Sequence, residues 1–376
     1  MLSFNVRRFA AALLAGAAIF GLSQPAAAAQ SKSFVIGWFQ LATYSKDGDC
    51  PGGVNPQQAD QFRNDMRAMG MSPKEVEDAI KTGVVDGDPI VPYMMAYRGR
   101  VDGKPVNAYS NPQTTADPKL HMLASPYAYG FNLDGKGATS PNSFEDPETH
   151  EKGVNNQLYR ALGCIQSHRS MYPERPTWWS WMWEELHESL PGWLITVKGE
   201  DLSKDGPVTI DIDRSLDHIV KNVKGETGAD ATFRLDPAPT AHNTFKGEIK
   251  NGVVAITEPG NMHLQGDPLF YAEFVLKQTH LRFKINPDGT ALGYLGGYQP
   301  WYMVYSAAGF GGFTVEVNFG LDSIGIYHNL RKMADSNPDP KTGQNRDIST
   351  AYLIEMVPAF VVPPAPVTAK TAQAGN

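Results

Sequence analysis

The loop after Ala334 carries oxygen-bearing side chains at alternate positions, a spacing that suits a metal ion. These residues are Asp335, Asn337, Asp339 and, further along, Asp347. Alternate carboxylate and amide oxygens let a turning loop wrap a hard cation such as Ca²⁺. Pro340 and Arg346 stand where an EF-hand loop has glycine and a bidentate glutamate, so Asp347 would have to supply the last ligand. The loop is a candidate Ca²⁺ site, and the alternative is a solvated connector stiffened by prolines.

A second group of oxygen side chains lies within residues 131–155. Its members are Asn132, Asp134, Asp146, Glu148 and Asn155. They are a second candidate Ca²⁺ site for the same reason, several oxygens on a loop held at both ends. The alternative is turn chemistry, because an Asn-x-Asp-Gly sequence forms a tight turn without a ligand.

Tryptophans gather in the sequence PTWWSWMWEEL, which begins at Pro176 and precedes a Pro191-Gly192 stop. They are Trp178, Trp179, Trp181 and Trp183, four of the seven in the chain. The stretch can form a helix, and so many large rings cannot all face one narrow stripe. Exposed rings would stack on a glycan or an apolar ligand. Burial of the rings in the core is the alternative.

Acidic residues beside these rings are the candidates for catalysis. They are Glu184, Glu185 and Glu188, together with His187. A glycosidase needs two carboxylates at the right separation, and these are the nearest to aromatic side chains. The sequence contains neither the GxSxG nor the HExxH motif of other hydrolases. The alternative is that the carboxylates form a solvated helix face.

The amino terminus has the features of a signal peptide. Arg7 and Arg8 precede an apolar run at 9–22, and small residues at 25–29 form a cleavage region. We therefore predict export to the periplasm or the outside, with a mature chain beginning near Gln30. The alternative is an uncleaved membrane anchor, and we predict no transmembrane segment after cleavage.

The two cysteines are Cys50 and Cys164. In an oxidising compartment two cysteines usually pair, so the sequence predicts a disulfide between them. Two buried free thiols are the alternative. The formal charge of the chain is -7, which disfavours nucleic acid as a partner, because nucleic-acid binding needs basic side chains.

The elements that position these residues form an α+β protein. Its centre is predicted to be an antiparallel β-sandwich or barrel-like domain at 193–318, with flanking helices and long ordered loops. Asn251-Gly252 predicts a two-residue hairpin there. Residues 30–192 are predicted to mix helices and loops after a first strand at 33–44, with a capping box at Ser72-Pro73-Lys74-Glu75. The pattern further predicts a helix-loop-helix at 319–364, packed on the β-domain, and a disordered tail at 365–376.

Three functions follow from these features. The first is a non-catalytic protein that binds a glycan, an apolar small molecule or a protein on an aromatic-lined surface, with Ca²⁺ or the disulfide fixing its loops. The second is an exported carbohydrate hydrolase that uses the carboxylates at 184–188. The third is an envelope assembly subunit with exposed aromatic residues.

Overall fold

The computed structural model describes residues 29–55, 58–85, 87–89, 99–186, 189, 191–265, 273–310 and 322–364. The predicted tail at 365–376, and all but the last residue of the predicted signal peptide, lie outside the described residues. Within the described ranges, every helix is too short or too polar to cross a lipid bilayer.

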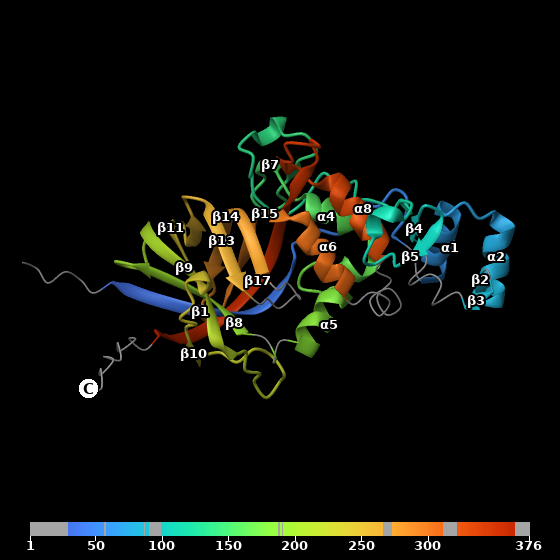
Figure 1. The fold of residues 1–376 in the computed structure, drawn as a ribbon. Helices are drawn as coiled ribbons and strands as arrows, with labels where there is room; N and C mark the ends of the chain where they lie inside the picture. Colours follow the sequence, from blue (N-terminus) through green and yellow to red (C-terminus); the bar gives the residue numbers. More distant parts are fainter. Residues whose placement is uncertain are drawn as a thin grey trace, which may run out of the picture.

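The centre of the molecule is a closed antiparallel barrel of eight strands (Figure 1). In spatial order they are β1 (Gln30–Leu41), β8 (Pro191–Gly199), β9 (Gly206–His218), β11 (His242–Lys250), β12 (Val253–Ile256), β14 (Glu273–Ile285), β15 (Ala291–Pro300) and β17 (Asn345–Val362). Antiparallel pairing of β1 with β17 closes the barrel, for example at Phe34 opposite Pro358. Closure removes both edges of the sheet.

In the described ranges, three further strands extend the sheet beyond the barrel. They are β10 (Ala231–Arg234), β13 (Gly260–Gln265) and β16 (Ser336–Pro338). β13 pairs with β14 and β16 with β17, both antiparallel, whereas β10 runs parallel to the end of β17.

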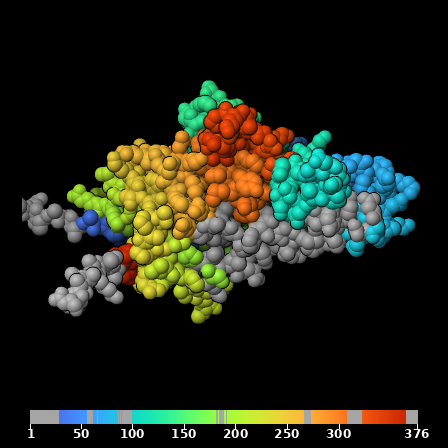
Figure 2. Space-filling model, viewed as in Figure 1, coloured from blue at the N-terminus to red at the C-terminus, as the bar shows by residue number. Residues whose placement is uncertain are grey.

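The helices among the described residues lie to one side of the barrel. They are α1 (Gln58–Ala68), α2 (Pro73–Thr82), α4 (Gln157–Leu162), α5 (Thr177–Leu186), α6 (Trp301–Phe310) and α8 (Ser323–Met333). Figure 1 shows α4, α6 and α8 beside the barrel and the α1–α2 pair at the far end, so the molecule is elongated, as Figure 2 also shows.

Short elements complete the connections. The strands are β2 (Val84–Val85), β3 (Asp88–Pro89), β4 (Gly99–Val101), β5 (Lys104–Val106), β6 (Phe144–Glu145) and β7 (Lys152–Val154). The 3-10 turns are η1 (Pro112–Thr114), η2 (Gly137–Thr139), η3 (Gln166–His168) and η5 (Pro239–Ala241).

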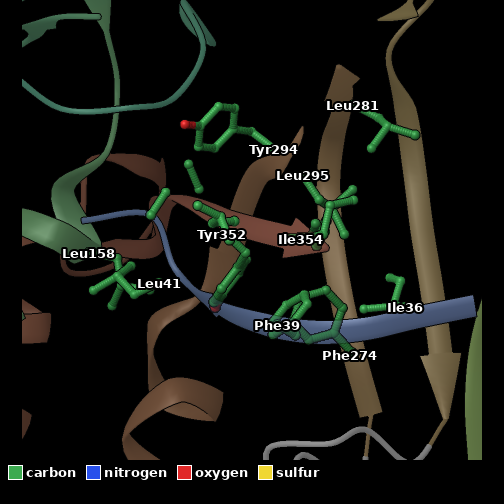
Figure 3. Close-up of a cluster of buried hydrophobic side chains, with 14 of the residues drawn as sticks. Ile36, Phe39, Leu41, Leu158, Phe274, Leu281, Tyr294, Leu295, Tyr352 and Ile354 are labelled. Carbon is green, nitrogen blue, oxygen red and sulfur yellow. The ribbon is translucent and has the colours of Figure 1, made fainter. Parts of the chain in front are cut away.

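Apolar side chains fill the barrel (Figure 3). Side chains on a strand point alternately to the two faces of the sheet, and the inward set includes Ile36, Leu281 and Leu295, each no more than 1% exposed. At one end of the barrel the Phe39 ring stacks on the Tyr352 ring with centroids 4.5 Å apart. The interior is thus a packed core made by the chain itself.

Several sequence predictions are confirmed. The β-rich domain is antiparallel, and of the two architectures left open it is the barrel that forms. The Ser72 hydroxyl accepts from Glu75 N while Glu75 Oε2 accepts from Ser72 N, which is the predicted capping box. Asn251 and Gly252 have φ of 52° and 74°, as a type I′ hairpin between β11 and β12 requires.

The helix-loop-helix prediction for 319–364 is wrong in its second half, because residues 345–362 form β17. The sequence ISTAYLIEMVPAF is apolar at nearly every position, and such a run does not distinguish a buried helix from a strand buried on both faces. Here the outward residue Leu353 is as well buried as the inward Ile354, at 3% and 0% exposure. The barrel also takes in β1, so it reaches beyond the predicted range of 193–318 on both sides.

Candidate functional site

The tryptophans of α5 belong mainly to the core. Trp178, Trp179 and Trp183 are each 5–6% exposed. Trp179 contacts the rings of Phe39 and Tyr352 edge-on or tilted, at 6.4 and 6.3 Å. Burial, the alternative to a ligand-binding role, is what the structure shows for these three rings. The side chain of Trp181 lies outside the description.

The predicted catalytic group cannot be placed in the same way. The backbone of Glu184 and Glu185 belongs to α5, but their side chains lie outside the described set. Residues His187 and Glu188 lie outside the described residues altogether. Catalysis by this group stays a prediction.

The first predicted Ca²⁺ loop is the hairpin between β16 and β17. The Asp335 carboxylate accepts from Ser349 N and Oγ, both at 2.7 Å. The Asn337 side-chain oxygen accepts from Arg346 at 2.9 Å, and Asp339 accepts from the backbone N–H groups of residues 341 and 342. The buried Asp347 carboxylate pairs with Lys277 at 2.6 Å. Each of these four side chains therefore accepts at least one hydrogen bond from the chain itself.

The second predicted Ca²⁺ loop is held together by similar bonds. The Asp134 carboxylate accepts from Ser140 Oγ at 2.6 Å and from Lys136 N at 3.0 Å. The Asn132 side-chain oxygen accepts from Gly137 N at 3.3 Å, and that of Asn155 from Leu133 N at 2.9 Å.

The structure brings the two loops close together. Burial of the Asp335 carboxyl group raises its pKa to about 6, although the hydrogen bonds from Ser349 oppose this shift. The Asp134 carboxylate of the second loop lies near enough to raise the pKa of Asp335 further. In the part of the chain that is described, no three His, Cys, Asp or Glu side chains converge as metal ligands would. Ca²⁺ binding at either loop stays a prediction.

The predicted disulfide between Cys50 and Cys164 is confirmed. Arg169 packs beside it and donates to Gly163 O at 2.7 Å and to Asp49 Oδ1 at 2.7 Å. The bridge thereby ties the loop after β1 to the segment that follows α4.

A pocket lies on the outer face of the barrel over β14 and β15. We call it the β14–β15 pocket, with a cavity volume of about 210 Å³. Its lining residues are Glu148, Thr149, Val253, Arg282, Phe283, Lys284, Asn286, Leu292, Gly293 and Tyr294. The floor is made by outward side chains that are neighbours on paired strands. Lys284 is opposite both Val253 and Leu292, and Arg282 is opposite Tyr294.

The wall of this pocket is a turn fastened to the barrel by Asp146. One Asp146 carboxylate oxygen accepts from Glu148 N and Thr149 N, both at 2.9 Å. The other is paired with the Arg282 guanidinium. Asp146 is fully buried, so this contact fixes the wall relative to the floor. Residues 144–154, which carry β6 and β7, stand above the barrel in Figure 1 and Figure 2.

The mouth of the pocket carries opposite charges. The Lys284 ammonium lies 3.6 Å from a Glu148 carboxylate oxygen, and the side chains are 62% and 54% exposed. That distance is too long for a direct hydrogen bond. The pair therefore leaves both charges able to accept other partners.

A row of four tyrosines runs from the pocket to the surface. Tyr294 stacks on Tyr129 with centroids 4.8 Å apart, and Tyr44 meets Tyr129 and Tyr127 edge-on at 5.6 and 6.1 Å. Burial raises the pKa of Tyr294 and, to a smaller degree, that of Tyr129.

The residues of this pocket were not among the predicted site residues, apart from Glu148. The sequence HLRFKI shows the alternation that turns Arg282 and Lys284 outwards. Outward charges usually mark only a solvated face, however, and the wall comes from a segment more than a hundred residues away in the chain.

Two larger hollows that are lined by described residues are less suited to hold a small ligand. One of about 620 Å³ lies against α2 and has a mainly polar lining, including Glu75 and Asp78. The other, of about 700 Å³, is open to solvent at the end of the barrel between Lys198 and Lys246.

Comparison of the chain with protein-family models, with curated proteins and with solved structures found no match.

Proposed function

We propose that this protein binds a small molecule in the β14–β15 pocket. The observation that carries the proposal is an apolar floor, made by Leu292 and Val253, beside polar groups that converge from two sides. Small-molecule sites combine an apolar surface with a few placed polar groups. The floor lies on paired strands, which hold such groups more precisely than loops do.

The filled interior of the barrel supports a site on its outside. Side chains such as Phe34 and Phe283 meet edge-on at 5.8 Å within the barrel. A ligand inside would have to displace close-packed side chains, which costs free energy. The outer pocket needs no such displacement.

Ion pairing of the charged groups favours binding over catalysis. Arg282 is committed to Asp146, and Lys284 faces Glu148. Charges that are held by a partner suit the orientation of a ligand more than proton transfer, which needs a group free to take up or release a proton.

The proposal keeps the predicted aromatic-lined surface but assigns it to other residues. We assign it to Tyr294, Tyr129, Tyr44 and Tyr127, because the described tryptophans of α5 are buried. We also retain export as part of the proposal. The disulfide supports it, because such bonds persist in oxidising compartments.

A ligand screen on the mature chain, residues 30–376, tests the proposal. A compound that binds the native state raises the midpoint of thermal unfolding. We expect such a compound to lose its effect in Leu292→Trp, in which the larger side chain fills the pocket. Thr232→Trp places the same side chain on an exposed strand position outside the pocket, and it should bind as the wild type does.

Two results contradict the proposal. One is a screen of small polar and amphipathic molecules in which none raises the midpoint. The other is a ligand that stabilises wild type and Leu292→Trp equally, because it would bind elsewhere.

Partner binding is a second candidate function, favoured by one observation. Val220, Val223 and Phe360 are more than half exposed and lie in segments joined by backbone hydrogen bonds near the end of β17. Large exposed apolar residues are enriched at protein interfaces. Elution of the purified mature chain as a monomer, without a copurifying protein, would argue against this function.

A further inference from the structure

We infer that the β14–β15 pocket binds a small zwitterion with an apolar side chain, of the class of the free α-amino acids. The inference rests on the proposed function and specifies the ligand of the same site. The charge at the mouth, the fixed spacing of wall and floor, and the size of the cavity support it.

The charges around the pocket balance. Arg282 and Lys284 are matched by Asp146 and Glu148. A simple anion that reached Lys284 would meet the Glu148 carboxylate, and a simple cation that reached Glu148 would meet the Lys284 ammonium. A ligand that carries both charges meets an opposite charge at each end.

The Glu148–Lys284 pair is arranged for such an exchange. Its separation of 3.6 Å exceeds a direct hydrogen bond, and both side chains are more than half exposed. A zwitterion inserted between them replaces one loose contact with two direct ones, carboxylate to Lys284 and ammonium to Glu148. Hydrogen bonds to charged groups are stronger than those between neutral groups.

The inner pair holds this arrangement in place. Asp146 is fully buried and binds Arg282 on the floor as well as the N–H groups of Glu148 and Thr149 in the wall. Its oxygens are therefore used within the protein. The turn that carries Glu148 is held opposite Lys284, so the ligand need not order the wall on binding, which would otherwise weaken affinity.

The floor and the volume define the rest of the ligand. Leu292 and Val253 flank Lys284 across the ladder, so an apolar side chain attached near the ligand's charges would lie on them. The cavity volume of about 210 Å³ is small. This size favours a ligand with few non-hydrogen atoms, such as a branched aliphatic amino acid, over a disaccharide.

Calorimetric titration of the mature chain with four probes tests the inference. L-leucine carries both charges, 4-methylpentanoate lacks the ammonium, 3-methylbutylamine lacks the carboxylate, and glucose is a neutral ring of similar size. We expect L-leucine to bind and each of the other three to bind about tenfold more weakly or not at all, since each loses at least one charge-assisted bond.

Two variants test whether the charges at the mouth of the pocket bind the ligand. Glu148→Gln and Lys284→Met each remove one charge at the mouth, and each should weaken L-leucine binding about tenfold or more. The matched controls are Glu258→Gln and Lys246→Met, which disrupt an exposed ion pair of 3.0 Å elsewhere on the same barrel. The controls should bind as the wild type does. Thermal unfolding of all four variants checks that the fold is retained.

The outcomes separate this inference from the proposed function. The inference is overturned if glucose, 4-methylpentanoate or 3-methylbutylamine binds as tightly as L-leucine, or if the mouth variants bind L-leucine unchanged. In those cases the proposed function still holds if Leu292→Trp abolishes the binding. If none of the four probes binds, the inference is also overturned, and the wider ligand screen then decides the proposed function.

Discussion

At the scale of single residues, His168 is a buried group with a large effect on how the free energy of unfolding depends on pH. Its ring lies parallel to Trp178 at 6.2 Å and edge-on to Trp179 at 6.1 Å. Burial lowers the pKa of His168 to about 3, and its Nδ1 has no hydrogen-bond partner among the described residues. The ring is therefore neutral in the folded protein at all but very low pH.

This burial predicts a loss of stability in mild acid. The unfolded chain takes up the His168 proton near pH 6.5, whereas the folded chain does so only near pH 3. The contribution of the neutral His168 ring to the free energy of unfolding is fully present above pH 6.5. It falls by about 1.4 kcal/mol per pH unit below that pH. Urea unfolding of the wild type and of His168→Phe at pH 7.5, 5.5 and 4.5 measures this loss of stability. The variant should show the shallower pH dependence, and parallel curves would contradict the assignment.

Asp146 gives a second prediction at this scale. Asp146→Asn keeps the size of the side chain but leaves the Arg282 guanidinium, 16% exposed, without its carboxylate partner. Breaking one side of a buried pair costs about 3–5 kcal/mol. Glu148→Gln removes an exposed partner only 3.6 Å from Lys284 and should cost less than about 1 kcal/mol. Equal losses in denaturant unfolding would show that the inner pair does not hold the wall.

At the scale of elements, the disulfide joins the loop after β1 to the segment after α4. The bonded cysteines are separated by 114 residues, and Arg169 adds hydrogen bonds beside them. Cys50→Ala/Cys164→Ala should lower the free energy of unfolding by about 2–5 kcal/mol, mainly because the unfolded chain gains freedom. Denaturant unfolding with and without reductant measures it. A reductant effect that persisted in the double variant would mean that the loss has another cause.

The elements that can be predicted from the sequence are those specified by residues close together in the chain. The Ser72 capping box and the Asn251-Gly252 hairpin are specified within four residues, so both were predicted correctly. The β17 strand was mistaken for a helix because its neighbours, β1 and β15, lie elsewhere in the chain. The β14–β15 pocket was missed for the same reason, since its floor and its wall come from distant segments.

At the scale of the whole molecule, the barrel is not a contiguous piece of sequence. Its first strand is β1 and its last is β17, and both lie outside the predicted range of 193–318. A fragment of that range lacks the strands that close the sheet, and unpaired edges promote aggregation. We expect residues 193–318 alone to give an aggregated or unfolded product by circular dichroism and gel filtration, whereas residues 30–364 should fold. A monomeric, cooperatively unfolding fragment would contradict this.

Closure of the barrel also sets an order of events during synthesis. Of the barrel strands β1 is made first, whereas its second neighbour, β17, is made last. Until then the apolar side chains of Phe34, Ile36 and Phe39 have no complete core to enter. The barrel therefore stays open until β17 has been made, and apolar side chains exposed in an open chain promote association. An open chain is also the form that a secretion channel can thread, so late closure is compatible with the export that we propose.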